Sequence, residues 1–110
     1  MCMAKPLDVA PDQFEAEVLQ EERPVVVDFW SETCAHCLTL NPHYDQAASE
    51  NEEVKFVKVS FQAARDLFRE YAVRATPTLV LFSGGEEIAR TVGAKRADEL
   101  NDWLKENTAG

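Results

Sequence analysis

Apolar residues along this chain fall into short runs typical of strands and into spacings typical of helices. The runs predict strands at residues 7–9, 25–30, 54–59, 78–82 and 87–92. The run at residues 25–30 is almost continuous, which is the pattern of a central strand covered on both faces. Gly84 and Gly85 separate the last two runs and supply the positive φ angles of a tight turn, so these two strands are expected to form an antiparallel hairpin.

Between these runs, apolar residues recur at intervals of three and four positions. This spacing predicts helices at about residues 11–20, 34–51, 62–71 and 97–105. In the second and longest of them, Leu38, Leu40, Tyr44 and Ala48 are expected along one side. Pro42 lies inside the same helix and should kink it, because proline donates no backbone hydrogen bond.

The order of these elements predicts an α/β fold. A strand that is joined to the next strand through a helix pairs with it in parallel, whereas a tight turn makes an antiparallel pair. We therefore expect a central mixed sheet of four to five strands, flanked by helices on both faces. The length of 110 residues and the hydrophobic content of 45% suit a single domain over residues 1–110, with residues 1–6 and 107–110 frayed.

The net charge of −9, from 20 acidic and 11 basic residues, argues against partners that are themselves strongly negative. Nucleic acids and anionic membranes both attract cationic patches, so neither is expected to bind. No apolar run approaches the ~20 residues of a membrane-spanning helix. The first residues contain no apolar stretch of the signal-peptide type, which favours a cytoplasmic location, with a removed presequence as the alternative. We expect a monomer.

The candidate chemistry lies in two of the three cysteines, Cys34 and Cys37, directly after the central strand. Their spacing puts both sulfurs on one face of a helix start, where unsatisfied N–H groups and the helix dipole favour a thiolate. The thiolate is the reactive form of cysteine. A zinc site needs about four ligands, and only Cys2, His36 and His43 remain as candidates. The pattern therefore favours a thiol–disulfide exchange site, with no metal.

Several positions around this pair resemble the thioredoxin family over residues 14–104. They are Asp28-Phe29-Trp30 before the cysteines, Pro42 after them, Lys58 on the next strand, Thr76-Pro77-Thr78, and Val92-Gly93-Ala94. The resemblance implies a thioredoxin fold, Cys34 as nucleophile and Cys37 as resolving thiol. It also implies that Pro77 is cis and that the Thr76 backbone and the Gly93-Ala94 loop bind an extended substrate.

Asp28 lies within an otherwise apolar strand, where a carboxylate is costly unless it is hydrogen-bonded or paired. One interpretation is a structural ion pair with Lys58, which would then support the site. The resemblance implies another, in which Asp28 is a buried general base that takes the proton of Cys37. Desolvation would raise the pKa of such a carboxyl toward neutrality. The two interpretations are compatible.

The stretch Thr33-Cys34-Ala35-His36-Cys37 departs from the Trp-Cys-Gly-Pro-Cys of thioredoxins proper. Thr33 removes a large apolar surface from the rim that faces partners, which also includes Ala35, while Trp30 is expected to pack beneath the site. His36 resembles the disulfide isomerases and the periplasmic thiol oxidases. Its imidazole either is a solvated helix residue or stabilises the Cys34 thiolate, which would make the disulfide more oxidising.

The sequence therefore predicts a thioredoxin-like protein disulfide reductase with a less reducing potential than ordinary thioredoxin. It needs no cofactor besides the Cys34–Cys37 disulfide. Its expected partners are protein disulfides and an electron donor of the thioredoxin-reductase type. Two alternatives stay open, a disulfide oxidase or isomerase, and a binding module that keeps the fold without catalysis.

Overall fold

A five-stranded mixed sheet forms the centre of the computed structural model, which describes residues 5–108. The strand order is β1-β3-β2-β4-β5. Their bounds are Leu7–Asp8 for β1, Val25–Trp30 for β2, Lys55–Ser60 for β3, Thr78–Ser83 for β4 and Glu86–Val92 for β5. β1, β3 and β2 pair in parallel, while β4 pairs antiparallel with both β2 and β5. The expected mixed sheet and the hairpin are both confirmed. The expectation that strands joined through a helix pair in parallel holds for β2 and β3 but is wrong for β3 and β4, because β2 lies between them and β4 runs antiparallel to it.

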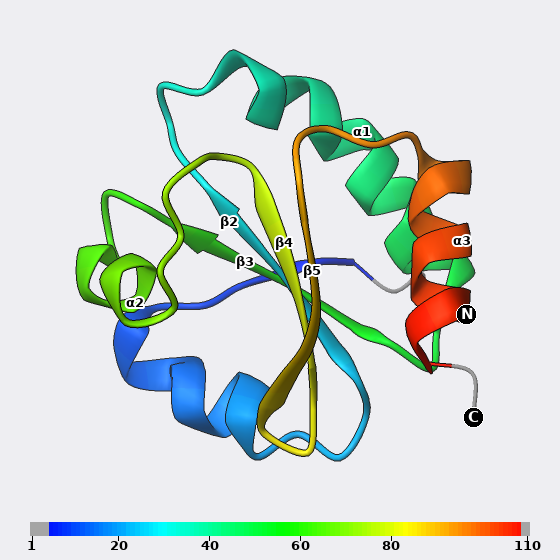
Figure 1. The fold of residues 1–110 in the computed structure, drawn as a ribbon, viewed down its shortest axis with the longest axis horizontal. Coiled ribbons are helices and arrows are strands. Elements are labelled where there is room, and N and C mark those ends of the chain that lie inside the picture. The colour runs from blue at the N-terminus through cyan, green and yellow to red at the C-terminus, as the bar shows by residue number, and fades with distance from the viewer. Residues whose placement is uncertain (1–4, 109–110) are drawn as a thin grey trace.

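Helices cover both faces of this sheet (Figure 1). α1 (Ala35–Glu50) and α3 (Ala97–Thr108) lie side by side on one face. The other face carries α2 (Arg65–Glu70), the 3₁₀ turn η1 (Pro11–Gln13) and the π-helical turn η2 (Glu15–Leu19). Residues 107 and 108, which were expected to fray, belong to α3. No helix within residues 5–108 has the length and apolar character needed to cross a membrane.

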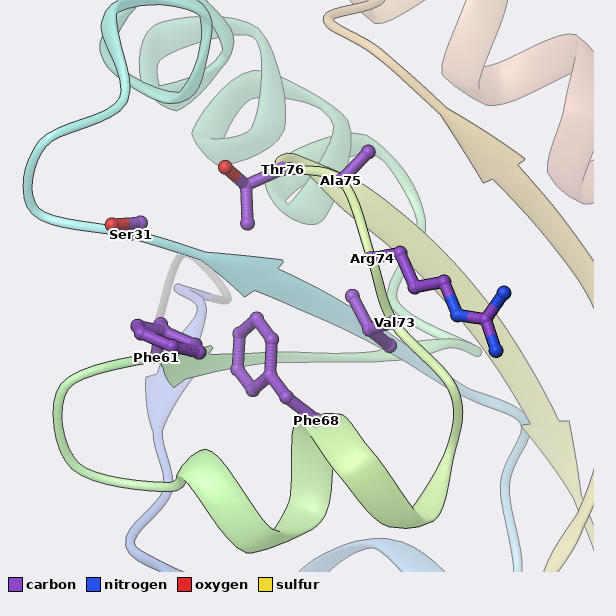
Figure 2. Close-up of a pocket in the computed structure, with 7 residues that line it drawn as sticks. All are labelled: Ser31, Phe61, Phe68, Val73, Arg74, Ala75 and Thr76. Atoms are coloured by element: carbon purple, nitrogen blue, oxygen red, sulfur yellow. The ribbon is translucent and has the colours of Figure 1, made fainter.

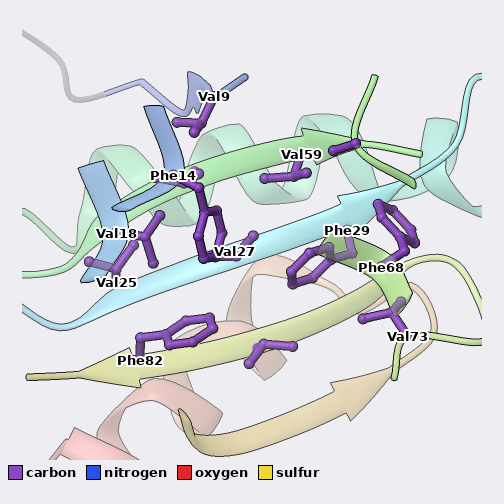
Figure 3. Packing of buried hydrophobic residues seen from close by; sticks show 13 residues of the cluster. Val9, Phe14, Val18, Val25, Val27, Phe29, Val59, Phe68, Val73 and Phe82 are labelled. Carbon is purple, nitrogen blue, oxygen red and sulfur yellow. The ribbon is translucent and has the colours of Figure 1, made fainter. Parts of the chain in front are cut away.

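Two hydrophobic clusters, one on each face, follow from the alternation along β2. Val25, Val27 and Phe29 point into the cluster under α2, where Phe29 meets the ring of Phe68 edge-on at 5.1 Å between centroids (Figure 3). Val26 points into the cluster under α1 and α3. Because side chains alternate with a period of two, Asp28 lies on the same face as Val26, beneath α1. The sheet thus directs a carboxyl toward the helix that carries both cysteines.

Three expectations about the helices were wrong in detail. The expected helix at residues 11–20 is divided into two turns with different hydrogen-bond spacings. Gln13 donates to the carbonyl of Ala10, three residues back, whereas Gln20 donates to the carbonyl of Glu15, five residues back. α2 begins at Arg65 rather than at residue 62. Leu38 is 64% exposed, because Cys37, one position earlier, takes the place on α1 that faces the sheet. A shift of one residue rotates a side chain by about 100° around the helix axis.

Candidate dithiol active site

Cys34 and Cys37 lie at the first turn of α1, as the spacing predicted. Cys34 is the N-cap residue, with extended backbone angles, and its sulfur accepts a hydrogen bond from the Cys37 amide at 3.2 Å. The sulfur thus takes the part that an oxygen plays in most N-caps. Cys37 has no exposed surface, whereas Cys34 is partly exposed, and both thiols are free. Cys2 lies outside the described residues.

The surroundings of Cys34 favour its thiolate. Burial alone would raise its pKa, but hydrogen bonds from Cys37 and Thr76, and from the backbone amides of Cys37 and His36, outweigh burial and lower the pKa below its ordinary value. In the neutral form, the thiol also donates to the Thr76 carbonyl at 3.4 Å. Cys34 is therefore poised as a nucleophile.

Cys37 is shifted in the opposite direction. Burial, followed by its hydrogen bond to Cys34, raises the pKa of Cys37 to about 11. The inner thiol therefore keeps its proton at neutral pH, whereas the outer thiol ionises more readily than an ordinary cysteine. Because thiol–disulfide exchange needs one thiolate to attack and a second thiol to resolve the mixed disulfide, this asymmetry assigns the first step to Cys34 and the second to Cys37.

The loop before β4 lies beside the Cys34 sulfur. The Thr76–Pro77 peptide bond is cis, as expected. The Thr76 carbonyl is within hydrogen-bond distance of Cys34, and the Pro77 carbonyl accepts from the amide of Gly93 at 2.8 Å. Gly93 has a φ of +99°, a region that favours glycine. The fold therefore brings Thr76, Pro77 and the loop of Gly93 and Ala94 together at the dithiol, although the chain separates them by some forty residues or more.

A cavity of about 230 Å³ extends from this loop along the sheet end (Figure 2). It is lined by Ser31, Phe61, Phe68, Val73, Arg74, Ala75 and Thr76. The side chains of Phe61, Phe68 and Val73 make its inner surface apolar, whereas the guanidinium of Arg74 points outward (Figure 2). An apolar cavity thus adjoins Thr76, whose carbonyl contacts the Cys34 sulfur, although residue 33 is a threonine and not a tryptophan.

A polar network that the sequence did not reveal holds the segment before Cys34. Gln62 donates to the Ser31 hydroxyl at 3.1 Å and accepts from the Glu32 amide at 3.2 Å. The Ser31 hydroxyl in turn lies 3.2 Å from the Thr33 hydroxyl. Local spacing carries no signal for Gln62, because it comes from the segment after β3, about thirty residues away in the chain.

Ala35 and His36 lie at the exposed surface of α1. For His36, the backbone amide contributes to stabilising the Cys34 sulfur. The role of its imidazole stays a prediction.

Asp28 is completely buried, and neither carboxyl oxygen has a hydrogen-bond partner among the described residues. Burial raises the pKa of Asp28 to about 7, and the charge of Lys58 only partly opposes this. A carboxyl that titrates near neutrality suits a general base or acid. No hydrogen bond joins this carboxyl to Cys37.

The ion pair expected between Asp28 and Lys58 is not formed. The two residues are register partners on β2 and β3, yet the Lys58 ammonium donates to the Asn41 side-chain oxygen at 3.0 Å. It also lies over the ring of Trp30, 5.0 Å from the centroid. Trp30 is partly exposed and lines a hollow together with Lys58 and Ser60, and its packing beneath the dithiol stays a prediction. Sequence analysis did not identify Asn41, although a polar residue within the otherwise apolar inner face of α1 is a signal that could have found it.

Within residues 5–108, no group of three or more histidine, cysteine or acidic side chains is placed to hold a metal ion.

Comparison with known proteins agrees with this geometry. The family model described as Thioredoxin matches residues 5–106. Thioredoxin C-3 of Corynebacterium nephridii is 36% identical over 100 residues, covering 91% of this chain and 69% of its own length. The thioredoxin of Rickettsia felis is 34% identical over 101 residues, covering 91% of this chain and 96% of its own. The crystal structure of Malassezia sympodialis thioredoxin (Mala s 13) superposes with a TM-score of 0.84 at 27% identity, covering 99% of this chain and 96% of that one.

Fold, dithiol geometry and similarity thus point the same way. A helix-capping cysteine with a lowered pKa precedes a buried partner with a raised one, beside a cis-proline loop. The chain belongs to the thioredoxin family and is a thiol–disulfide oxidoreductase that acts through Cys34 and Cys37.

Proposed function

We propose that this protein is a protein disulfide reductase with a less reducing potential than ordinary thioredoxin. The observation that carries the proposal is the opposite displacement of the two thiol pKa values. Interactions that stabilise the Cys34 thiolate stabilise the reduced form, which makes the disulfide more oxidising. For this two-electron couple, each 1.4 kcal/mol corresponds to about 30 mV. The amide of His36 contributes to that stabilisation.

The reaction starts when the Cys34 thiolate attacks one sulfur of a substrate disulfide. The other substrate sulfur leaves as a thiolate, and a mixed disulfide remains on Cys34. Cys37 then gives its proton to the carboxylate of Asp28, through a water, and attacks the Cys34 sulfur. The second substrate thiolate leaves. The substrate disulfide has then been reduced by two electrons, and Cys34 and Cys37 have been oxidised to a disulfide. An electron donor of the thioredoxin-reductase type returns the pair to the dithiol.

The substrate lies in an extended conformation along the Thr76 backbone. The loop of Gly93 and Ala94 holds its other side, and the exposed Val92 beside this loop adds apolar surface. The functional direction is reduction in the cytoplasm, and the protein works as a monomer with no cofactor beyond its own disulfide. Lys58 supports the site, and Thr33 and Ala35 form the rim that faces the partner.

A trapping experiment tests the mechanism. In a Cys37→Ser variant, the first step proceeds but the mixed disulfide cannot be resolved, so covalent partners should accumulate on Cys34. The matched Cys34→Ser variant keeps the inner thiol and should trap none, because Cys37 is buried and holds its proton. If neither variant trapped a partner, the reductase mechanism would be wrong.

A second candidate, a disulfide oxidase or isomerase, is favoured by the histidine at position 36. The reduction potential separates the two. A potential near the cytosolic glutathione poise, about −220 to −320 mV depending on the method, supports the reductase, and one far above it supports the oxidase. We expect His36→Pro to lower the potential, and a potential that did not fall would remove His36 from the explanation.

A further inference from the structure

The buried Asp28 and the half-buried Lys58, on neighbouring strands, face the same helix without pairing. Adjacent strands lie about 4.8 Å apart, and a lysine side chain can swing its ammonium over a longer distance than that. Asp28 and Lys58 occupy the same register on β2 and β3. The cation could therefore reach the carboxyl, yet it bonds to Asn41 at 3.0 Å and lies over Trp30 instead.

No other charged group competes for this carboxyl within the described part of the chain. From β3, Lys58 is the charged group that acts on Asp28. From α1, the Tyr44 hydroxyl is within 2.9 Å of the Val26 carbonyl and 2.8 Å of the Val57 carbonyl, and Cys37 keeps its proton at neutral pH. From β4, the register partner is the apolar Leu79. The position of one ammonium group therefore controls the charge environment of Asp28.

We propose that Asn41 is a positioning residue, whose side-chain oxygen holds the Lys58 ammonium against Trp30 and so withholds it from the Asp28 carboxyl. This inference rests on the proposed function, in which Asp28 accepts the proton of Cys37. A carboxylate paired with the lysine would be too weak a base for that step near neutrality, because a cation within ~4–6 Å lowers the pKa of an Asp by about 1–3 units. Asn41 thereby preserves a carboxyl that can exchange a proton at neutral pH.

The test follows the titration of Asp28 directly, by carbon NMR of its carboxyl group in the oxidised protein. In Asn41→Ala, the ammonium loses its acceptor and turns toward Asp28, so the titration midpoint should fall by about one pH unit or more. Asn41→Asp keeps an acceptor oxygen for Lys58, and its midpoint should not fall below that of the wild type. A midpoint that stays unchanged in Asn41→Ala would overturn the proposal.

A double-mutant cycle separates positioning from a general effect on packing. Lys58→Met removes the ammonium and should raise the Asp28 midpoint, because the lysine charge lowers it in the wild type. In that background, Asn41→Ala should change nothing further. If it lowered the midpoint equally without Lys58, Asn41 would act by another route and the proposal would be wrong. Alanine is the better helix former, so folding is expected, and Asn41→Leu provides a second variant that lacks the acceptor.

Failure of this inference and failure of the proposed function give different results. The titration is read in the disulfide form without substrate, so it reports on Asn41 even if Cys37→Ser traps no partner. Conversely, trapping by Cys37→Ser with an unchanged Asn41→Ala midpoint would leave the reductase mechanism intact and refute only the positioning role. In the reduced protein, the pH profile for resolving a mixed disulfide should shift with the Asp28 midpoint.

Discussion

Replacing the buried carboxyl of Asp28 by an amide should stabilise the oxidised protein, and by an amount that grows with pH. Asp28 has no exposed surface and its oxygens have no hydrogen-bond partner among residues 5–108. Its pKa is raised from 3.8 to about 7, mainly by burial. In Asp28→Asn, the amide has nearly the same shape but never ionises, so the cost of burying a charge disappears.

The sign and size of the effect follow from linkage. The folded state binds the proton of Asp28 more tightly than the unfolded chain does. The protonated carboxyl therefore stabilises the folded wild type fully below about pH 4, and this stabilisation is lost as the pH rises through about 7. The pKa of Asp28 rises from 3.8 to about 7, and each pKa unit corresponds to about 1.36 kcal/mol. The free energy of unfolding of the wild type should therefore fall by about 4 kcal/mol between pH 4 and pH 9. With a urea m-value of about 2 kcal/mol/M, the Asp28→Asn midpoint at pH 9 should lie about 2 M above that of the wild type.

Urea unfolding of the oxidised proteins between pH 4 and 9 measures this directly. The Asp28→Asn and wild-type midpoints should be close at the acid end and should diverge through neutrality. The control variant Asp102→Asn removes an exposed negative charge on α3. Its urea midpoint should stay close to that of the wild type at every pH. A constant difference between Asp28→Asn and wild type across the range would refute the assignment of a raised pKa to Asp28.

Three other outcomes follow from the structure. Alkylation of reduced Cys34, followed by mass spectrometry, should show a midpoint below the ~8.5 of a free thiol, while Cys37 stays unmodified; equal labelling would contradict the asymmetry. Gly85→Ala should cost roughly 2 kcal/mol or more in thermal unfolding, because the new Cβ would lie 2.9 Å from a backbone oxygen, whereas Gly84→Ala, with open space around it, should cost only about 1. Tyr44→Phe removes a buried hydroxyl that bonds to β2 and β3 and should lower stability by about 1–3 kcal/mol without changing Cys34 alkylation; unchanged stability would show that these bonds contribute nothing net.

Much of the fold could be predicted because it rests on local periodicity. The apolar run at residues 25–30 became β2, and the glycine pair gave a hairpin turn with φ values of +61° and +83°. The periodic signal was weaker for Leu38, which lies one position from the inward-facing Cys37 and is exposed. The spacing of apolar residues locates the apolar face of a helix only to within about one residue, which corresponds to about 100° of rotation. A residue at the edge of that face, such as Leu38, is therefore easily assigned to the wrong side.

The sequence by itself determined the pair of sulfurs at a helix start, because the regular geometry of a helix sets the relative positions of residues three apart in the chain. It also indicated the family, through motifs that occur in a fixed order over residues 14–104. Only the tertiary structure decided that Lys58 bonds to Asn41 rather than Asp28, that Thr76 meets the Cys34 sulfur, and that the two thiols are shifted in opposite directions. Burial and contacts between distant segments govern these properties, because desolvation and hydrogen bonding depend on what the packed layers bring together.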